Sequence, residues 1–323
     1  MMLCDLHADT FWKIDRTRKK LGEDSPELQT SIPRLKAGGV GLQVMACFVE
    51  EKYVPFKACS KALELLDMAH GELEENRKDI EIIRAPWDAE RISASGKLAA
   101  LLAVEGGHAL EGDLTKLRTF FRLGVRILTL TWNNSNDLAF SGKDPDGERH
   151  GLLPPGVEAV EKMNELGMMI DLSHSGPVTF QEVLERSAYP VFASHSCARA
   201  LCDHNRNLTD QQLKALADKG GVVGVSLANN FLSLPGSEVT CETVVDHIAH
   251  IRKVAGIGVI AFGSDFDGVD DLPQGLQSAA DWPNLLSALK RRGFTEEEIA
   301  RFSSGNFLRF WKSVCRDAPP ADA

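Results

Sequence analysis

The sequence lacks several features that would mark a membrane or nucleic-acid-binding protein. No apolar run approaches the roughly 18–20 residues needed to span a bilayer, and no basic segment followed by a long apolar stretch opens the chain. Basic residues are in the minority, with 36 Lys and Arg against 46 Asp and Glu, and the formal net charge is −10. These absences argue against nucleic acid or a membrane as a partner and predict a cytoplasmic protein without a signal peptide.

Two further absences concern cysteine and glycine motifs. The seven cysteines are scattered without a Cys-x-x-Cys pair, and an odd number in a chain this long favours reduced thiols over a disulfide framework. Neither a G-x-G-x-x-G sequence nor a Walker sequence is present. Their absence argues against an open, doubly wound sheet that binds a nucleotide, although such a sheet remains the alternative architecture.

What the sequence does contain is a regular alternation of short β-rich apolar runs and helical patterns. Eight such runs predict strands at residues 2–7, 41–48, 98–104, 126–131, 168–173, 191–194, 222–227 and 259–264. Apolar residues at helical spacing predict helices at residues 56–75, 114–123, 157–166, 178–187, 210–218, 241–254 and 282–291.

Eight buried strands alternating with helices predict an α/β fold of the TIM (β/α)8 barrel type. A length of 323 residues would also allow two domains, but α/β barrels often fill this size as one, and the alternation shows no break. We therefore expect a single catalytic barrel domain over residues 1–318. The last residues, 319–323, are expected to be a disordered tail.

Polar, metal-ligating residues follow five of the predicted strands. They are His7 and Asp9 in "DLHADT", Glu105 in "VEGGH", His174 in "DLSHSG", His195 in "SHS" and Asp265 in "GSDFDG". Barrel enzymes build their sites at the carboxyl ends of the strands, so these side chains should converge. Burying so many ionisable groups together would be costly without a cation. Nitrogen and oxygen ligands suit zinc, with manganese, iron or cobalt as alternatives.

Each of these residues also has an ordinary explanation when it is taken alone. A histidine after a strand is commonly a turn residue or a hydrogen-bonded core group, and an aspartate before glycine is a routine turn former. These explanations do not account for the clustering of carboxylates and imidazoles on strand ends of one barrel. The combined pattern therefore favours a metal centre.

Together these motifs, with "HNRN" at residues 204–207, closely resemble the membrane (renal) dipeptidase family, whose members are zinc dipeptidases of the amidohydrolase superfamily. The resemblance runs in order from residue 5 to "SGNFLR" at residues 304–309. It implies two divalent ions per chain, one held by His7 and Asp9 and the other by His174 and His195. Glu105 would bridge the two ions. It also suggests a homodimer.

The resemblance further implies a reaction and the residues that carry it. The expected activity is hydrolysis of the amide bond of dipeptides, including those with a C-terminal D-residue, by a hydroxide that bridges the two metals. Asp265 would handle the proton of the attacking water, and Arg206 would bind the substrate. Two alternatives remain: another amidohydrolase reaction, on N-acyl amino acids, cyclic amides or lactones, and a catalytically silent metal-binding protein.

One position departs from the family pattern. After the fourth predicted strand the better-known animal members have "LTLTH", whose histidine helps to hold the substrate and the developing oxyanion. This chain reads "LTLTWNNSND", with Trp132 in that place. Trp132 is expected to bind substrate as a flat apolar wall of the pocket. The competing hypothesis is that a donor is missing, or is supplied by an amide of Asn133, Asn134 or Asn136.

Overall fold

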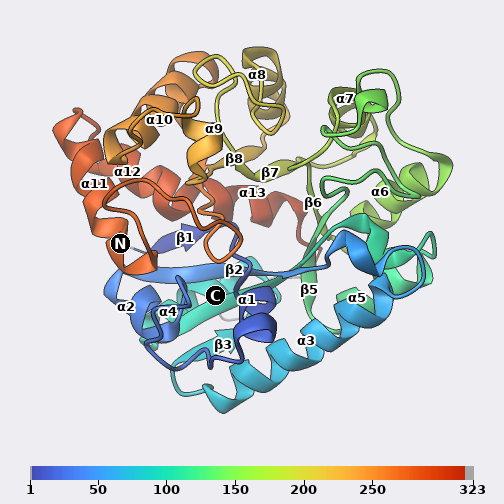
Figure 1. Cartoon of the computed structure of the whole chain (residues 1–323), viewed down its shortest axis with the longest axis horizontal. Coiled ribbons are helices and arrows are strands. Elements are labelled where there is room, and N and C mark those ends of the chain that lie inside the picture. Colours follow the sequence, from blue (N-terminus) through green and yellow to red (C-terminus); the bar gives the residue numbers. More distant parts are fainter. Residues whose placement is uncertain (1, 317–323) are drawn as a thin grey trace.

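The computed structural model describes residues 2–316 and confirms the predicted TIM barrel (Figure 1). Every strand pairing in its main sheet is parallel, and β2 pairs with both β1 and β4, which closes the ring. The ring follows the order β1, β2, β4, β5, β6, β7, β8, β9. Its strands are β1 (Leu3–Asp5), β2 (Val40–Phe48), β4 (Leu98–Glu105), β5 (Val125–Thr129), β6 (Met169–Asp171), β7 (Phe192–Ser196), β8 (Val222–Val225) and β9 (Ile260–Phe262).

One strand lies outside the predicted set. β3 (Ile80–Ile82) pairs in parallel with the first residues of β4, while β2 holds the other side of that strand. With only three residues next to the polar segment "NRKD", β3 gives no alternating or continuous apolar pattern that sequence analysis can detect.

The helices surround the strands, and α3, α5, α6, α7, α8, α10 and α11 lie on the outside of the ring in Figure 1. Their bounds are α1 (Thr10–Thr17), α2 (Ile32–Ala37), α3 (Ala58–Glu75), α4 (Pro86–Ala94), α5 (Thr115–Arg122), α6 (Pro154–Leu166), α7 (Pro177–Arg186), α8 (Asp210–Asp218), α9 (Asn229–Leu232), α10 (Cys241–Ala255), α11 (Trp282–Arg291), α12 (Glu296–Ala300) and α13 (Asn306–Val314). The seven predicted helices correspond to α3, α5, α6, α7, α8, α10 and α11. The predicted set does not include α1, α2, α4, α9, α12 or α13.

Local sequence explains where these helices begin and end. α8 begins with a capping box, in which the Thr209 hydroxyl accepts from the Gln212 backbone N–H and the Gln212 side chain accepts from the Thr209 N–H. α6 ends at Gly167, which takes the left-handed conformation with φ +69°. Glycine reaches that conformation without the steric cost that other residues meet.

Apolar side chains fill the interior of the barrel at the amino-terminal ends of the strands. Phe192 of β7 packs against Phe307 and Phe310 of α13, with ring centroids 6.4 and 5.1 Å apart. These rings join the inward-facing side chains of the strands in one buried apolar cluster. Because α13 and this cluster fill that end, polar side chains are left to gather at the carboxyl ends of the strands.

Within the described residues, no helix has both the length and the apolar character required to cross a bilayer. The tail predicted at residues 319–323 lies outside the described residues. The single catalytic domain over residues 1–318 stays a prediction, and residues 1, 317 and 318 also lie outside the described residues.

Candidate metal centre

The five predicted ligands and Asp265 are brought together at the carboxyl ends of the strands. Glu105 is the last residue of β4, and His195 lies in β7. His7, His174 and Asp265 each follow the end of a strand by two or three residues. His174 and Asp265 both have φ +67°, a backbone conformation that costs side-chain-bearing residues energy and is concentrated at functional sites.

The side chains form two groups that share Glu105. In the first, Glu105 Oε1 lies 3.0 Å from His174 Nε2 and 3.6 Å from His195 Nε2, and the two imidazole nitrogens are 3.1 Å apart. In the second, His7 Nε2 lies 3.5 Å from Glu105 Oε2, 3.7 Å from Asp9 Oδ1 and 4.0 Å from Asp265 Oδ1. Each oxygen of Glu105 thus faces a different set of ligand atoms.

The nitrogen and oxygen atoms of this cluster are suited to binding divalent cations, because hydrogen bonds among themselves leave some of them without a partner. His7 Nε2 and Asp9 Oδ1 are buried without a hydrogen-bond partner among the described residues. Burial and the nearby Glu105 charge raise the pKa of Asp9 to about 8, and burial raises the pKa of Asp265 to about 7. The cluster is therefore short of positive charge. Two cations, one in each group, would satisfy these atoms and keep the carboxylates ionised.

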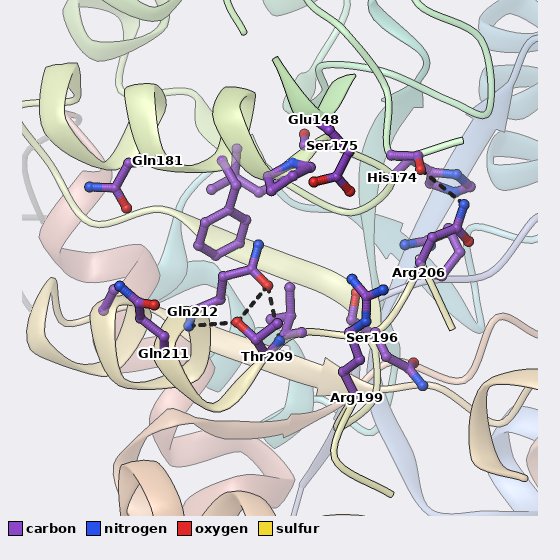
Figure 2. A pocket seen from close by; sticks show the side chains of 18 residues that line it. Glu148, His174, Ser175, Gln181, Ser196, Arg199, Arg206, Thr209, Gln211 and Gln212 are labelled. Atoms are coloured by element: carbon purple, nitrogen blue, oxygen red, sulfur yellow. Dashed lines mark hydrogen bonds between the residues drawn. The ribbon is translucent and has the colours of Figure 1, made fainter. Parts of the chain in front are cut away.

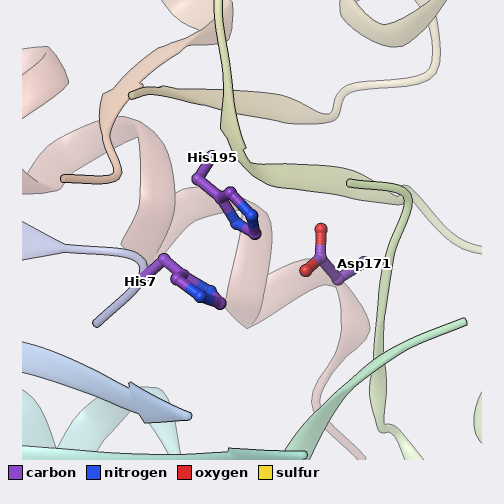
Figure 3. A group of neighbouring side chains, drawn as sticks. All are labelled: His7, Asp171 and His195. Carbon is purple, nitrogen blue, oxygen red and sulfur yellow. The ribbon is translucent and has the colours of Figure 1, made fainter. Parts of the chain in front are cut away.

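His7 and His195 also lie close to a further carboxylate, that of Asp171 (Figure 3). Ser194 stands between them: its Oγ donates to Asp171 Oδ2 at 2.6 Å and lies 2.8 Å from His195 Nδ1 and 3.4 Å from His7 Nδ1. Asp171 also accepts from two backbone N–H groups and a second hydroxyl. Asp171 thus acts on both imidazoles through the Ser194 hydroxyl, and the Nε2 atoms of His7 and His195 are left to face Glu105.

Asp171 is not among the predicted site residues, although its place in the sequence carries one signal. It stands three residues before His174 in "DLSHSG", at the end of a buried strand. The hydrogen bonds that define its role run through Ser194, which lies on the neighbouring strand. No spacing within the sequence reveals that connection.

The tryptophan at the divergent position lies against the cavity of the metal centre. This cavity has a volume of about 460 Å³ and is lined by Trp132 and Phe48, whose rings are 4.9 Å apart between centroids. The Trp132 ring lies 6.2 Å from the His174 ring. Trp132 therefore forms a wall of the cavity beside His174, one of the predicted metal ligands.

The three neighbouring asparagines have different surroundings. Asn133 lines the cavity, and its Oδ1 lies 3.1 Å from His174 Nδ1. Asn136 is bound within its own loop, to the backbone of Leu130 and Leu138. Asn134 contacts the Ser135 carbonyl, and neither Asn134 nor Asn136 lines the cavity. Of the three amides, that of Asn133 alone adjoins the site.

Arg206 borders the same cavity and is 6 % exposed. Its Nη2 donates to the His195 carbonyl at 3.2 Å, its guanidinium carbon lies 5.2 Å from the centre of the Phe231 ring, and its Nε has no partner among the described residues. Burial lowers the pKa of Arg206, whereas the charges of Asp265 and Glu105 act to raise it. A buried guanidinium that forms no ion pair within residues 2–316 is a ready site for an anionic group.

A second cavity, of about 480 Å³, adjoins the first through shared residues. Figure 2 shows His174 and Arg206 at one end of it and Gln181 and Gln211 at the other. Thr209 and Gln212, which line it, are hydrogen-bonded to each other as the cap of α8. Of the predicted metal ligands, His174 alone lines this second space, whereas Asp9, Glu105, His174 and His195 line the first cavity.

Comparisons with known proteins show which family and which fold this chain resembles. Residues 1–320 match the profile of a family described as membrane dipeptidase (peptidase family M19). Dipeptidase 3 of Homo sapiens is 39 % identical over 290 residues, which cover 88 % of this chain and 58 % of that protein. An uncharacterized dipeptidase of Schizosaccharomyces pombe is 36 % identical over 299 residues, which cover 88 % of this chain and 72 % of that one. The chain thus spans little more than half the length of the human relative.

Among solved structures, a metallo peptidase from Rhodobacter sphaeroides has a similar fold. Its TM-score is 0.89 at 25 % identity, over 97 % of this chain and 99 % of that one. That protein was crystallised with a phosphinate mimic of the dipeptide L-Ala-D-Ala.

Proposed function

The chain belongs to the membrane dipeptidase family, peptidase family M19, and from this premise we propose that it is a metal-dependent dipeptidase acting through two divalent ions. The observation that carries the proposal is the position of Glu105, which presents one oxygen to each of two buried sets of ligands. The unpaired guanidinium of Arg206 borders the same cavity and matches the carboxylate that every dipeptide carries.

The ligand assignment follows the two groups of side chains. His7 and Asp9 would hold one ion, His174 and His195 the other, and Glu105 both. Imidazole and carboxylate ligands without thiolate favour zinc. When bound, two such ions would supply Lewis acidity: they would lower the pKa of water towards neutrality and polarise the amide carbonyl.

The chain's own residues would then position the substrate and move the proton. Arg206 binds the α-carboxylate of the C-terminal residue through two parallel N–H···O bonds. Asp265 borders the cavity beside the second ligand group, with Oδ1 4.0 Å from His7 Nε2. From there it accepts the proton of the attacking water and returns it to the leaving amine. The bound mimic in the Rhodobacter sphaeroides relative supports including substrates with a C-terminal D-residue.

The first prediction concerns metal content and turnover together. Protein saturated with Zn²⁺ and freed of excess metal should contain close to two equivalents by elemental analysis, and should hydrolyse L,L- or L,D-dipeptides. A chelator should abolish that turnover, and zinc should restore it. Saturation at one equivalent would remove the bridging role from Glu105. Turnover of N-acyl amino acids, cyclic amides or lactones, with none of dipeptides, would favour the alternative amidohydrolase reaction.

The second prediction separates the two hypotheses for Trp132. We expect Trp132→His to change the preference among substrate side chains while kcat on simple dipeptides rises less than about tenfold, because the ring packs on Phe48 as a wall. If an oxyanion donor were missing, the new imidazole should recover part of the roughly 10²–10³-fold that one such donor contributes. Steady-state kinetics on several unrelated dipeptides measures the difference, and a uniform rise of tenfold or more would contradict the wall.

Asn133 offers a reason why no donor need be missing. With its Oδ1 directed to His174 Nδ1, its NH₂ group is left for the cavity that Asn133 lines. We therefore assign the oxyanion donor to Asn133 Nδ2. In this arrangement one amide both orients a metal ligand and contacts the substrate.

A further inference from the structure

Lys143 is a cation of the active-site cavity that the proposed reaction does not use. It lines the same cavity as Trp132 and Arg206 and is exposed to solvent there. Across residues 2–316 its ammonium group takes part in no ion pair. Acidic residues are in excess in this protein, whose net charge is −10, yet none of the described residues forms an ion pair with Lys143.

The loop that carries Lys143 is fixed to the site on both sides. The backbone N–H of Gly142 donates to the His174 carbonyl at 2.7 Å, and Asn205 Nδ2 donates to the Gly142 carbonyl at 2.9 Å. A side chain at Gly142 would place its Cβ 3.2 Å from the Ser175 carbonyl oxygen, tighter than an ordinary contact. Lys143 therefore starts from a backbone held between a proposed metal ligand and the residue that precedes Arg206.

The carboxylates near Lys143 are already engaged. Those that line the cavity are Asp9, Glu105 and Asp265, which belong to the metal centre. The next residue along the chain, Asp144, accepts from Ser135 Oγ at 2.5 Å and from the Asp146 N–H at 3.0 Å, and it does not line the cavity. A carboxylate of the substrate is therefore the anion that Lys143 can pair with in this cavity.

We propose that the preferred substrates are dipeptides whose C-terminal residue is Asp or Glu, with Lys143 binding the side-chain carboxylate. This specificity rests on the proposed dipeptidase function and deepens it. Arg206 takes the α-carboxylate of the C-terminal residue, and Asn205 ties the Lys143 loop to the Arg206 side of the cavity. In the proposed arrangement Lys143, which lines the same cavity, binds the side chain of that same residue. Arg206 and Lys143 would each bind one of the two carboxylates of the C-terminal residue.

The test compares substrates that differ in charge but hardly in size. We expect the zinc-loaded protein to hydrolyse Ala-Glu with a kcat/KM about fivefold higher than Ala-Gln, the size of a partly solvated ion pair. The preference should shrink as NaCl is raised from about 0.05 M to about 0.5 M, because salt screens a solvent-exposed pair. The D-enantiomers at the C-terminal position are run in parallel, so that stereochemistry does not hide the charge effect.

Variants at Lys143 assign the effect to this residue. Lys143→Met should equalise Ala-Glu and Ala-Gln, and Lys143→Glu should favour Ala-Lys over Ala-Gln by a similar factor. Lys214→Met is the matched control, since Lys214 is an exposed lysine on α8 that lines neither cavity, and it should keep the wild-type preference.

Two results would overturn the inference, and they are distinguishable. Equal rates on Ala-Glu and Ala-Gln, or an equal loss on both in Lys143→Met, would remove the acidic specificity and leave the dipeptidase function intact. Failure of the zinc-loaded protein to hydrolyse any of the dipeptides would contradict the proposed function itself and the specificity with it.

Discussion

Replacing Glu105 with glutamine is expected to leave a folded chain that retains fewer than two metal ions and has lost turnover at least about a thousandfold. Glu105 is 2 % exposed, and its two oxygens face the imidazoles of both ligand groups, so one neutral side chain weakens both sites. Removing one partner from a buried charge pair costs about 3–5 kcal/mol, which corresponds to roughly two to four orders of magnitude in affinity. Elemental analysis after dialysis and initial rates on a dipeptide measure the two effects.

Glu72→Gln is the matched control for this experiment. Glu72 is another buried glutamate, at 5 % exposure, but its carboxylate accepts from the Leu21 N–H at 2.9 Å and pairs with Lys20 Nζ at 2.8 Å. Its replacement should lower the melting temperature without changing metal content or kcat. If Glu105→Gln bound two ions as tightly as the parent, Glu105 would not bridge the sites. Glu105→Gln could fail to fold while Glu72→Gln folds. Metal titration of Glu105→Asp would then test the bridging role, because aspartate keeps the negative charge but is too short to contact both ligand groups.

Much of the fold can be predicted from the sequence, because the buried parallel strands of a barrel have a recognisable apolar pattern. Each buried strand of a barrel reads as a short apolar run, and the residues after all such runs meet at one face. For this reason Glu105 after "LAALLAV" and Asp265 after "VIAFGS" could be placed together, although they are 160 positions apart along the chain. Their convergence required no knowledge of side-chain contacts.

The supporting residues could not be predicted in the same way. Asp171 acts on the ligand imidazoles through one serine hydroxyl, and Asn133 acts through a single 3.1 Å contact with His174. Both depend on rotamers and on distances of a fraction of an ångström, which residue spacing does not encode. Sequence analysis grouped Asn133 with two other asparagines, and only the fold separates the one beside the site from the two that serve their own loop.

"GSDFDG" gives an internal comparison for the proposed proton carrier. Asp265 and Asp267 stand two residues apart, both buried and both with positive φ, +67° and +65°. Asp267 accepts from the Gln29 N–H at 2.7 Å and from the Thr30 hydroxyl, so its carboxylate secures a loop. Asp265 instead borders the cavity, within 4.0 Å of His7 Nε2. The same residue type at neighbouring positions therefore has two separable roles.

Asp265→Asn should retain close to two metal ions and lose kcat by at least about a hundredfold, the usual contribution of a positioned proton shuttle. Asparagine keeps the size of the side chain but cannot accept a proton from the attacking water or return it to the leaving amine. KM should change little, because Arg206 still holds the substrate carboxylate. Asp267→Asn, in contrast, should lower thermal stability and leave kcat within a few-fold of the parent. A metal-replete Asp265→Asn with near-normal kcat would show that another group moves the proton, and loss of metal from it would instead make Asp265 a ligand of the second group.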